Sequence, residues 1–121
     1  MEFKFDNNIP IYVQLVEQIK MYIISGRIKL GEKLPSVREL ALLTKVNPNT
    51  MQKALGELEE LKLIYTERTN GKYVTTDQEL IDELRGDYAY MLSANYFSNM
   101  ESIGFTKKEA IHYLEKMGGD K

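Results

Sequence analysis

The sequence predicts a mainly α-helical protein with a small β-hairpin. We expect a winged helix-turn-helix domain over residues 1–76 and a two-helix dimerisation tail over residues 77–121. Three observations predict this fold. Two helix-starting signals follow one another closely, at Ser36 and Asn47. A hairpin-turn signal, Thr69–Gly71, separates two short runs of β-forming residues. After Thr76, apolar residues recur at the spacings of three and four that mark one face of a helix.

The first helix is expected to begin at Pro10, because a proline in the first helical turn loses no hydrogen bond. Apolar residues then recur along one face, and Gly26 supplies a C-terminal stop. That face carries Ile11, Leu15, Ile19, Tyr22 and Ile23.

The next two helices carry the clearest capping signals in the chain. Ser36 and Glu39 form a capping box, in which each side chain bonds the backbone N–H of the other residue. Asn47 is the following N-cap, and Pro48 stands at the first helical position. The third helix is expected to bury Met51, Leu55 and Leu58 and to expose its polar residues. Two short helices with a tight turn between them, the second opening with small polar side chains, have the layout of a DNA-binding helix-turn-helix.

Residues 63–68 and 72–76 can form the two strands of a hairpin, which completes a winged helix. In the tail, a helix of about twenty residues is expected to end near Ser102–Gly104, and Thr106 with Glu109 caps a last helix. Two such helices cannot bury their apolar faces on each other alone, so a symmetric homodimer is expected. The candidate dimerisation residues are Ile81, Leu84, Tyr88, Met91, Leu92, Tyr113 and Leu114.

Composition excludes several classes of function. The chain has 121 residues, no cysteine and one histidine, His112, so neither a disulfide nor a metal site is expected. No nucleophile–base set or nucleotide-binding loop is present, so we expect neither an enzyme nor a cofactor. The chain shows no secretory signal and no membrane-spanning run, which favours a cytoplasmic protein. Residues 1–76 carry a net charge of +2 and residues 77–121 a net charge of −4, as fits a DNA-binding module fused to a part that avoids DNA.

An ordered set of motifs runs from Ile9 to Val74. Its parts are Pro10-Ile11-Tyr12-x-Gln14, then Gly26-x-Ile28-x-x-Gly31-x-x-Leu34-Pro35-Ser36-x-Arg38-x-Leu40-Ala41, then Val46-Asn47-x-Asn49-Thr50-x-x-Lys53-Ala54, and finally Leu58-x-x-Leu61 with Gly71-x-x-Val74. This set resembles the GntR family of bacterial transcription regulators, and the short tail is similar to that of its YtrA subfamily. The resemblance implies a homodimeric repressor on a pseudo-palindromic operator, controlled by a small-molecule effector of unknown identity and regulating a transporter operon.

Candidate contacts to double-stranded DNA cluster at the second and third helices. The resemblance implies that Arg38 contacts a phosphate or a base, and a planar guanidinium suits either. Asn49 and Thr50 occupy the first turn of the third helix, where short polar side chains and free backbone N–H groups suit phosphates. Gln52 can pair with adenine, and Lys53 with guanine or a phosphate.

The wing supplies the remaining candidates. Arg68 can enter a minor groove, and Gly71 lets the hairpin backbone approach the DNA. Lys72 is a weaker candidate for a phosphate contact. Ser36 mainly caps its helix and can also touch a phosphate.

Each candidate has an ordinary structural alternative. Arg38 can instead pair with Glu39 or Glu57, the polar start of the third helix can serve capping alone, and a plain hairpin turn explains Gly71. The tail aromatics suit a dimer core or an apolar effector pocket. For the whole chain, the alternative is a winged-helix protein–protein interaction module without DNA binding, which the pI of about 5.5 favours.

Two positions depart from the family pattern. Lys62 stands where the family usually has glycine before the first wing strand, so we expect a left-handed lysine there. Gly56 stands in the third helix where an aromatic residue is common. It costs about 1 kcal/mol of helix propensity relative to alanine, unless another backbone approaches it.

Overall fold

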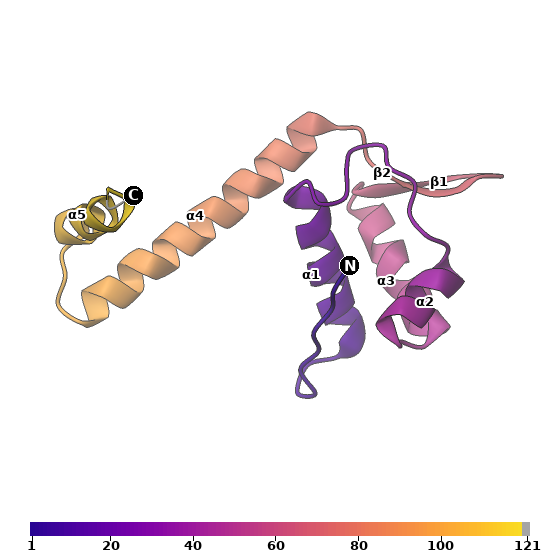
Figure 1. Cartoon of the computed structure of the whole chain (residues 1–121), viewed down its shortest axis with the longest axis horizontal. Helices are drawn as coiled ribbons and strands as arrows, with labels where there is room; N and C mark the ends of the chain where they lie inside the picture. Colours follow the sequence, from indigo (N-terminus) through magenta and orange to yellow (C-terminus); the bar gives the residue numbers. More distant parts are fainter. Residues whose placement is uncertain (120–121) are drawn as a thin grey trace. The chain divides into compact units, whose positions relative to one another are not determined.

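The computed structural model describes residues 1–119, and the chain divides into two compact units, Met1–Asp82 and Glu83–Lys121. The first unit contains three helices and a hairpin: α1 (Ile11–Ile24), α2 (Val37–Thr44), α3 (Pro48–Glu60), β1 (Ile64–Glu67) and β2 (Gly71–Val74) (Figure 1). Helix α4 (Gln78–Ser102) begins in the first unit, and α5 (Lys107–Gly118) lies in the second. This order confirms the predicted winged helix-turn-helix followed by two helices.

The core of the first unit lies between α1 and α3, which run side by side (Figure 1). Both helices turn the predicted apolar faces inward, and the hairpin closes the core at the end of α3. The fully buried side chains include Leu15, Ile19 and Ile23 of α1, Met51, Leu55 and Leu58 of α3, and Leu63, Ile64 and Val74 around the hairpin.

The local signals at α2 and α3 fold as predicted. The Ser36 hydroxyl accepts the Glu39 N–H at 3.1 Å, and a Glu39 carboxylate oxygen accepts the Ser36 N–H at 3.0 Å, which completes the capping box. Asn47 caps α3, with Pro48 as its first residue. Lys45 makes the tight turn between the two helices in a left-handed conformation, with φ of 57°.

The wing is a two-stranded antiparallel hairpin in which Ile64 pairs with Val74 and Glu67 with Gly71. The chain just before α2 adds to its edge, because Lys33 bridges Tyr73 and the Leu34 N–H donates to the Lys72 carbonyl at 2.8 Å. This short addition was not predicted. It ties the start of α2 to the second wing strand.

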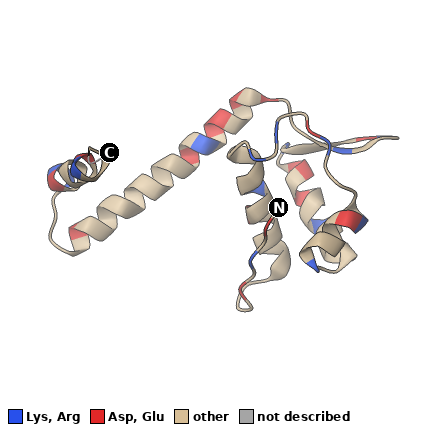
Figure 2. Ribbon diagram, viewed as in Figure 1, with Lys and Arg blue, Asp and Glu red and all other residues tan. Residues whose placement is uncertain are grey.

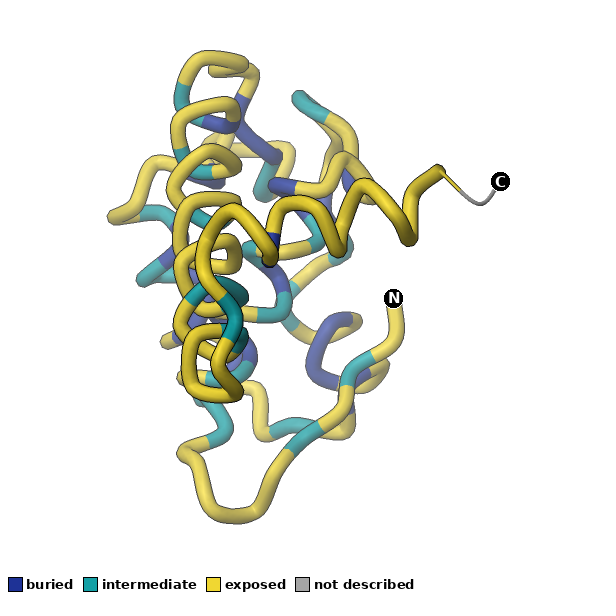
Figure 3. Tube along the Cα trace, turned by 90° about the vertical axis from the view of Figure 1, so that its left-hand side faces the viewer, coloured by how far each residue is buried: buried dark blue, intermediate teal, exposed yellow. Residues whose placement is uncertain are grey.

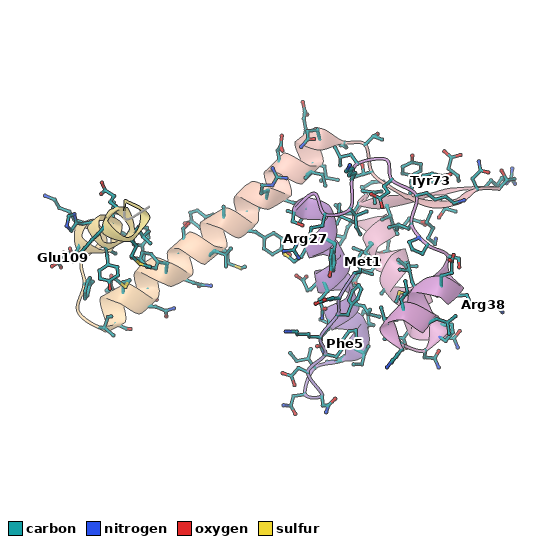
Figure 4. All side chains as sticks on the ribbon, in the orientation of Figure 1. Met1, Phe5, Arg27, Arg38, Tyr73 and Glu109 are labelled. Atoms are coloured by element: carbon teal, nitrogen blue, oxygen red, sulfur yellow. The ribbon has the colours of Figure 1, made fainter. Side chains whose placement is uncertain are left out.

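An unpredicted N-terminal strap, residues 1–9, runs along α1 (Figure 4, where Met1 and Phe5 are labelled). Side chains one turn apart on α1 hold its backbone, each bonding both the N–H and the carbonyl of one strap residue. Gln14 binds Asp6, Gln18 binds Lys4, and Tyr22 binds Glu2, at 2.6–3.1 Å.

The second unit contains most of α4 and all of α5. Helix α4 ends at Ser102, and Gly104 turns the chain with a φ of 97°. The predicted capping box of Thr106 and Glu109 then starts α5. Tyr96 donates a hydrogen bond to the Ala110 carbonyl at 2.7 Å and so links the two helices. Figure 3 shows α5 exposed along almost its whole length. In the part of the chain that the structure describes, no helix is long and apolar enough to cross a membrane.

Candidate nucleic-acid interface

The first turns of α3 present polar side chains to solvent. The Asn47 side chain accepts the Asn49 N–H at 2.8 Å, which fixes the start of the helix. The side chains of Asn49 and Gln52 are exposed, whereas Thr50 is half-buried. Capping therefore occupies the side chain of Asn47 and leaves the two exposed amides to meet a ligand.

Lys53 lies one turn further along α3 and is also exposed. Its ammonium nitrogen sits 4.0 Å from the centre of the Tyr12 ring on α1, a cation–π contact that orients the lysine. Along α3 the basic residue Lys53 comes before three acidic residues, Glu57, Glu59 and Glu60, and Figure 2 shows blue nearer the start of this helix and red nearer its end. We missed Tyr12 as a partner of Lys53, because the contact joins two helices far apart in the sequence.

Arg38 is exposed on α2, on the side that faces away from α1 (Figure 4). Among the residues that the structure describes, it makes no ion pair with Glu39 or Glu57. The Glu39 carboxylate is held by the cap instead: hydrogen bonds from Ser36 lower its pKa, and the charge of Lys33 lowers it further. Arg38 lines a shallow hollow of about 290 Å³ with Lys45 and Pro48.

A groove of about 430 Å³ separates the start of α2 from the wing. Four predicted residues line it: Ser36, Arg68, Gly71 and Lys72. Lys33, which was not among the candidates, also lines it. Gly71 has a φ of 106°, and a Cβ atom there would lie 3.4 Å from the Lys33 side chain. Two cations, Lys33 and Arg68, and an exposed glycine along one groove suit a phosphate backbone, although the carboxylates of Glu39 and Glu67 line the groove as well.

Lys72 lines the same groove but is already paired. Its ammonium lies 3.2 Å from the Glu59 carboxylate of α3 and donates to the Thr66 hydroxyl at 2.9 Å. This placement argues against the phosphate contact expected for Lys72.

The seven tail residues proposed for dimerisation differ in how far they are buried. Ile81 is only 2% exposed and belongs to the first unit, so it offers no surface to a partner. This corrects its assignment to the dimerisation face. Leu84 and Tyr88 are half-buried, and the other four are exposed: Met91, Leu92, Tyr113 and Leu114. The second unit also exposes Tyr90, Ile103, Ile111 and Met117.

Comparisons with known proteins identify the family. Residues 11–74 match the family described as Bacterial regulatory proteins, gntR family. The chain is 48% identical over 66 residues to the HTH-type transcriptional repressor YtrA of Bacillus subtilis, covering 54% of this chain and 51% of YtrA.

Two solved structures extend the comparison. A GntR family transcriptional regulator from Listeria monocytogenes is 45% identical, with a TM-score of 0.82, over 93% of this chain and 98% of that one. The AraR DNA-binding domain in complex with operator ORX1 is 30% identical, with a TM-score of 0.57, over 62% of this chain and 96% of that one. These proteins are transcription regulators rather than enzymes. More than half of the chain lies inside the family match and folds as a winged helix-turn-helix, so the chain belongs to the GntR family of bacterial transcription regulators.

Proposed function

We propose that this chain is a cytoplasmic homodimeric repressor that binds a pseudo-palindromic operator. The similarity to YtrA, which is named a repressor, supports repression rather than activation. Each protomer would insert the start of α3 into a major groove and lay the wing against an adjacent minor groove. By resemblance, the regulated genes would include a transporter operon.

The open start of α3 is the observation that carries this proposal. Asn49 and Gln52 are exposed, hydrogen-bonding side chains on a helix whose cap is already satisfied by Asn47. Arg38 and Lys53 lie on the same helix-turn-helix and form no salt bridge with a described residue. Amide side chains that can read bases, flanked by cations that can hold phosphates, are what duplex recognition requires.

The tail supports the homodimer. Of its large apolar side chains, eight are markedly exposed, and Tyr90 is 78% exposed. Exposed apolar side chains in this number on a short helical pair mark an interaction surface. A second copy would cover it symmetrically and set the distance between the two DNA-reading helices.

Fluorescence anisotropy with a labelled duplex from the promoter of the chain's own gene tests the proposal. We expect specific binding that weakens steeply as salt rises, because phosphate contacts release counterions. A shuffled duplex of equal length and composition is the control. Replacing Asn49 and Gln52 together by alanine should abolish the preference for the promoter over the shuffled duplex. Absence of binding by folded protein at micromolar concentration and low salt would overturn the proposal.

One observation favours a second candidate function, a protein-interaction module. Leu42 and Leu43 on α2 are 73% and 66% exposed, which is more than any other large apolar side chain of the first unit. Exposed leucines on a helix suit a protein partner better than DNA. Failure of the anisotropy experiment, with the protein folded, would favour this candidate.

A further inference from the structure

Three side chains form a closed polar cluster between α3 and the wing. Glu59 comes from α3, Thr66 from β1 and Lys72 from β2. The Thr66 hydroxyl donates to a Glu59 carboxylate oxygen, and the Lys72 ammonium lies 3.2 Å from that same oxygen and 2.9 Å from the hydroxyl. Each member therefore contacts both of the others.

The cluster joins the base-reading helix to both strands of the wing. Thr66 and Lys72 face one another in the hairpin register, so their side chains lie on the same face of the sheet. The neighbouring pair, Tyr65 and Tyr73, stacks on the opposite face. The buried pair of Ile64 and Val74 lies on the same face of the hairpin as Thr66 and Lys72. The cluster therefore extends the contact between this face and α3 toward the tip of the wing.

We propose that Glu59, Thr66 and Lys72 are positioning residues that brace the wing against α3, and that Lys72 is not a DNA contact. The proposal rests on the DNA-binding function proposed above. The wing and α3 must enter neighbouring grooves together, so the angle between them matters for affinity. The brace fixes that angle before DNA arrives and reduces the ordering that binding would otherwise require.

The burial of Lys72 separates this role from a phosphate contact. Its side chain is 17% exposed, compared with 38% for Glu59. To reach a phosphate, the ammonium would have to leave a carboxylate and a hydroxyl that already satisfy it. Arg68 and Lys33 line the same groove without a salt bridge to any residue that the structure describes. These two cations are therefore better placed to meet the backbone of DNA.

Salt dependence distinguishes the two roles. Each phosphate that a protein neutralises adds about 0.9 to the slope of log affinity against log salt. If a lysine contacts a phosphate, removing its charge lowers the salt slope by the contribution of that one contact. A lysine that acts through Glu59 leaves the slope unchanged, although the affinity falls.

The experiment compares Lys72→Met, Glu59→Gln and the double variant with wild type, using the full chain and the promoter duplex. We expect each single variant to weaken binding by about fivefold, the size of one partly exposed ion pair. The salt slope should not change, and the double variant should bind no more weakly than either single one. Arg68→Met is the matched control, and its slope should fall by about one phosphate contact.

Two results would overturn the brace. One is a fall in the salt slope for Lys72→Met together with unchanged or tighter binding by Glu59→Gln, as expected if Lys72 binds phosphate and Glu59 only repels DNA. The other is seen without DNA: amide exchange of the hairpin should accelerate in both single variants, and unchanged exchange would contradict the proposal. This second measurement still decides the question if wild type binds no promoter, a result that would instead refute the proposed function.

Discussion

Gly56 lies in the middle of α3, and we expect its replacement by alanine to stabilise the protein. Helical glycine costs about 1 kcal/mol relative to alanine, because the unfolded chain loses more freedom when it orders. The usual exception is a glycine that admits a neighbouring backbone. That exception does not apply here, since no heavy atom outside its own helix turn lies within 4 Å of a Cβ built at this position. The free energy of unfolding should therefore rise by about 1 kcal/mol.

Thermal and urea unfolding followed by circular dichroism measure this gain. For a unit of this size, about 1 kcal/mol corresponds to a rise in Tm of about 4–8 °C, with the urea m-value unchanged. Both proteins must be compared at one concentration, because an association would raise the apparent stability. Gly71→Ala is the matched control and should destabilise, because Gly71 has a φ of 106°. A Gly56→Ala protein no more stable than wild type would refute the reasoning that the space beside Gly56 is open.

Four further predictions follow from the side chains and backbone angles described above. Arg38→Ala should weaken operator binding by about 1–3 kcal/mol in an anisotropy titration, with an unchanged Tm. The homodimer proposed above predicts that Leu92→Glu shifts the chain from dimer to monomer in sedimentation, because the change puts a charge among the exposed apolar side chains of the tail. Lys62→Gly should raise the free energy of unfolding by about 1 kcal/mol, since Lys62 has a φ of 68°. Capping hydrogen bonds lower the pKa of Glu39 and Glu109 below the ordinary value of 4.5. The stability that these two carboxylates contribute is therefore present at neutral pH and is lost as the pH falls below 4.5. Urea unfolding between about pH 7 and about pH 3 measures this loss.

The parts of the fold that the sequence predicted well depend on short-range chemistry. Ser36 with Glu39, and Thr106 with Glu109, need only three residues of chain to form their reciprocal hydrogen bonds. The left-handed turn at Lys62 and the turn before Gly71 are equally local. Such signals identify where an element starts and ends whatever packs against it, so the helix order could be read in advance.

The parts that could not be predicted depend on partners distant in the sequence. The strap is held by Gln14, Gln18 and Tyr22. In the sequence alone the two glutamines look like ordinary polar residues of a helix, and Tyr22 falls on the apolar face. Ile81 follows the same periodicity as the tail residues after it, yet it is buried in the first unit. Periodicity reports that a face is apolar, but it does not report what covers that face.

Lys72 shows the same limit at the candidate interface. A cation on a wing resembles a phosphate ligand when it is counted by residue type, and its partner Glu59 lies 13 residues away on another element. Arg38, by contrast, is also a cation, and its expected partners Glu39 and Glu57 form no ion pair with it in the described chain. DNA affinity depends on the number of cations that are free to neutralise a phosphate and so displace its counterion, not on the number of cations present. We therefore expect the salt slope of the complex to include contributions from Arg38, Arg68, Lys33 and Lys53 but none from Lys72. A salt slope that falls when the charge of Lys72 is removed would mean that DNA binding breaks the ion pair with Glu59.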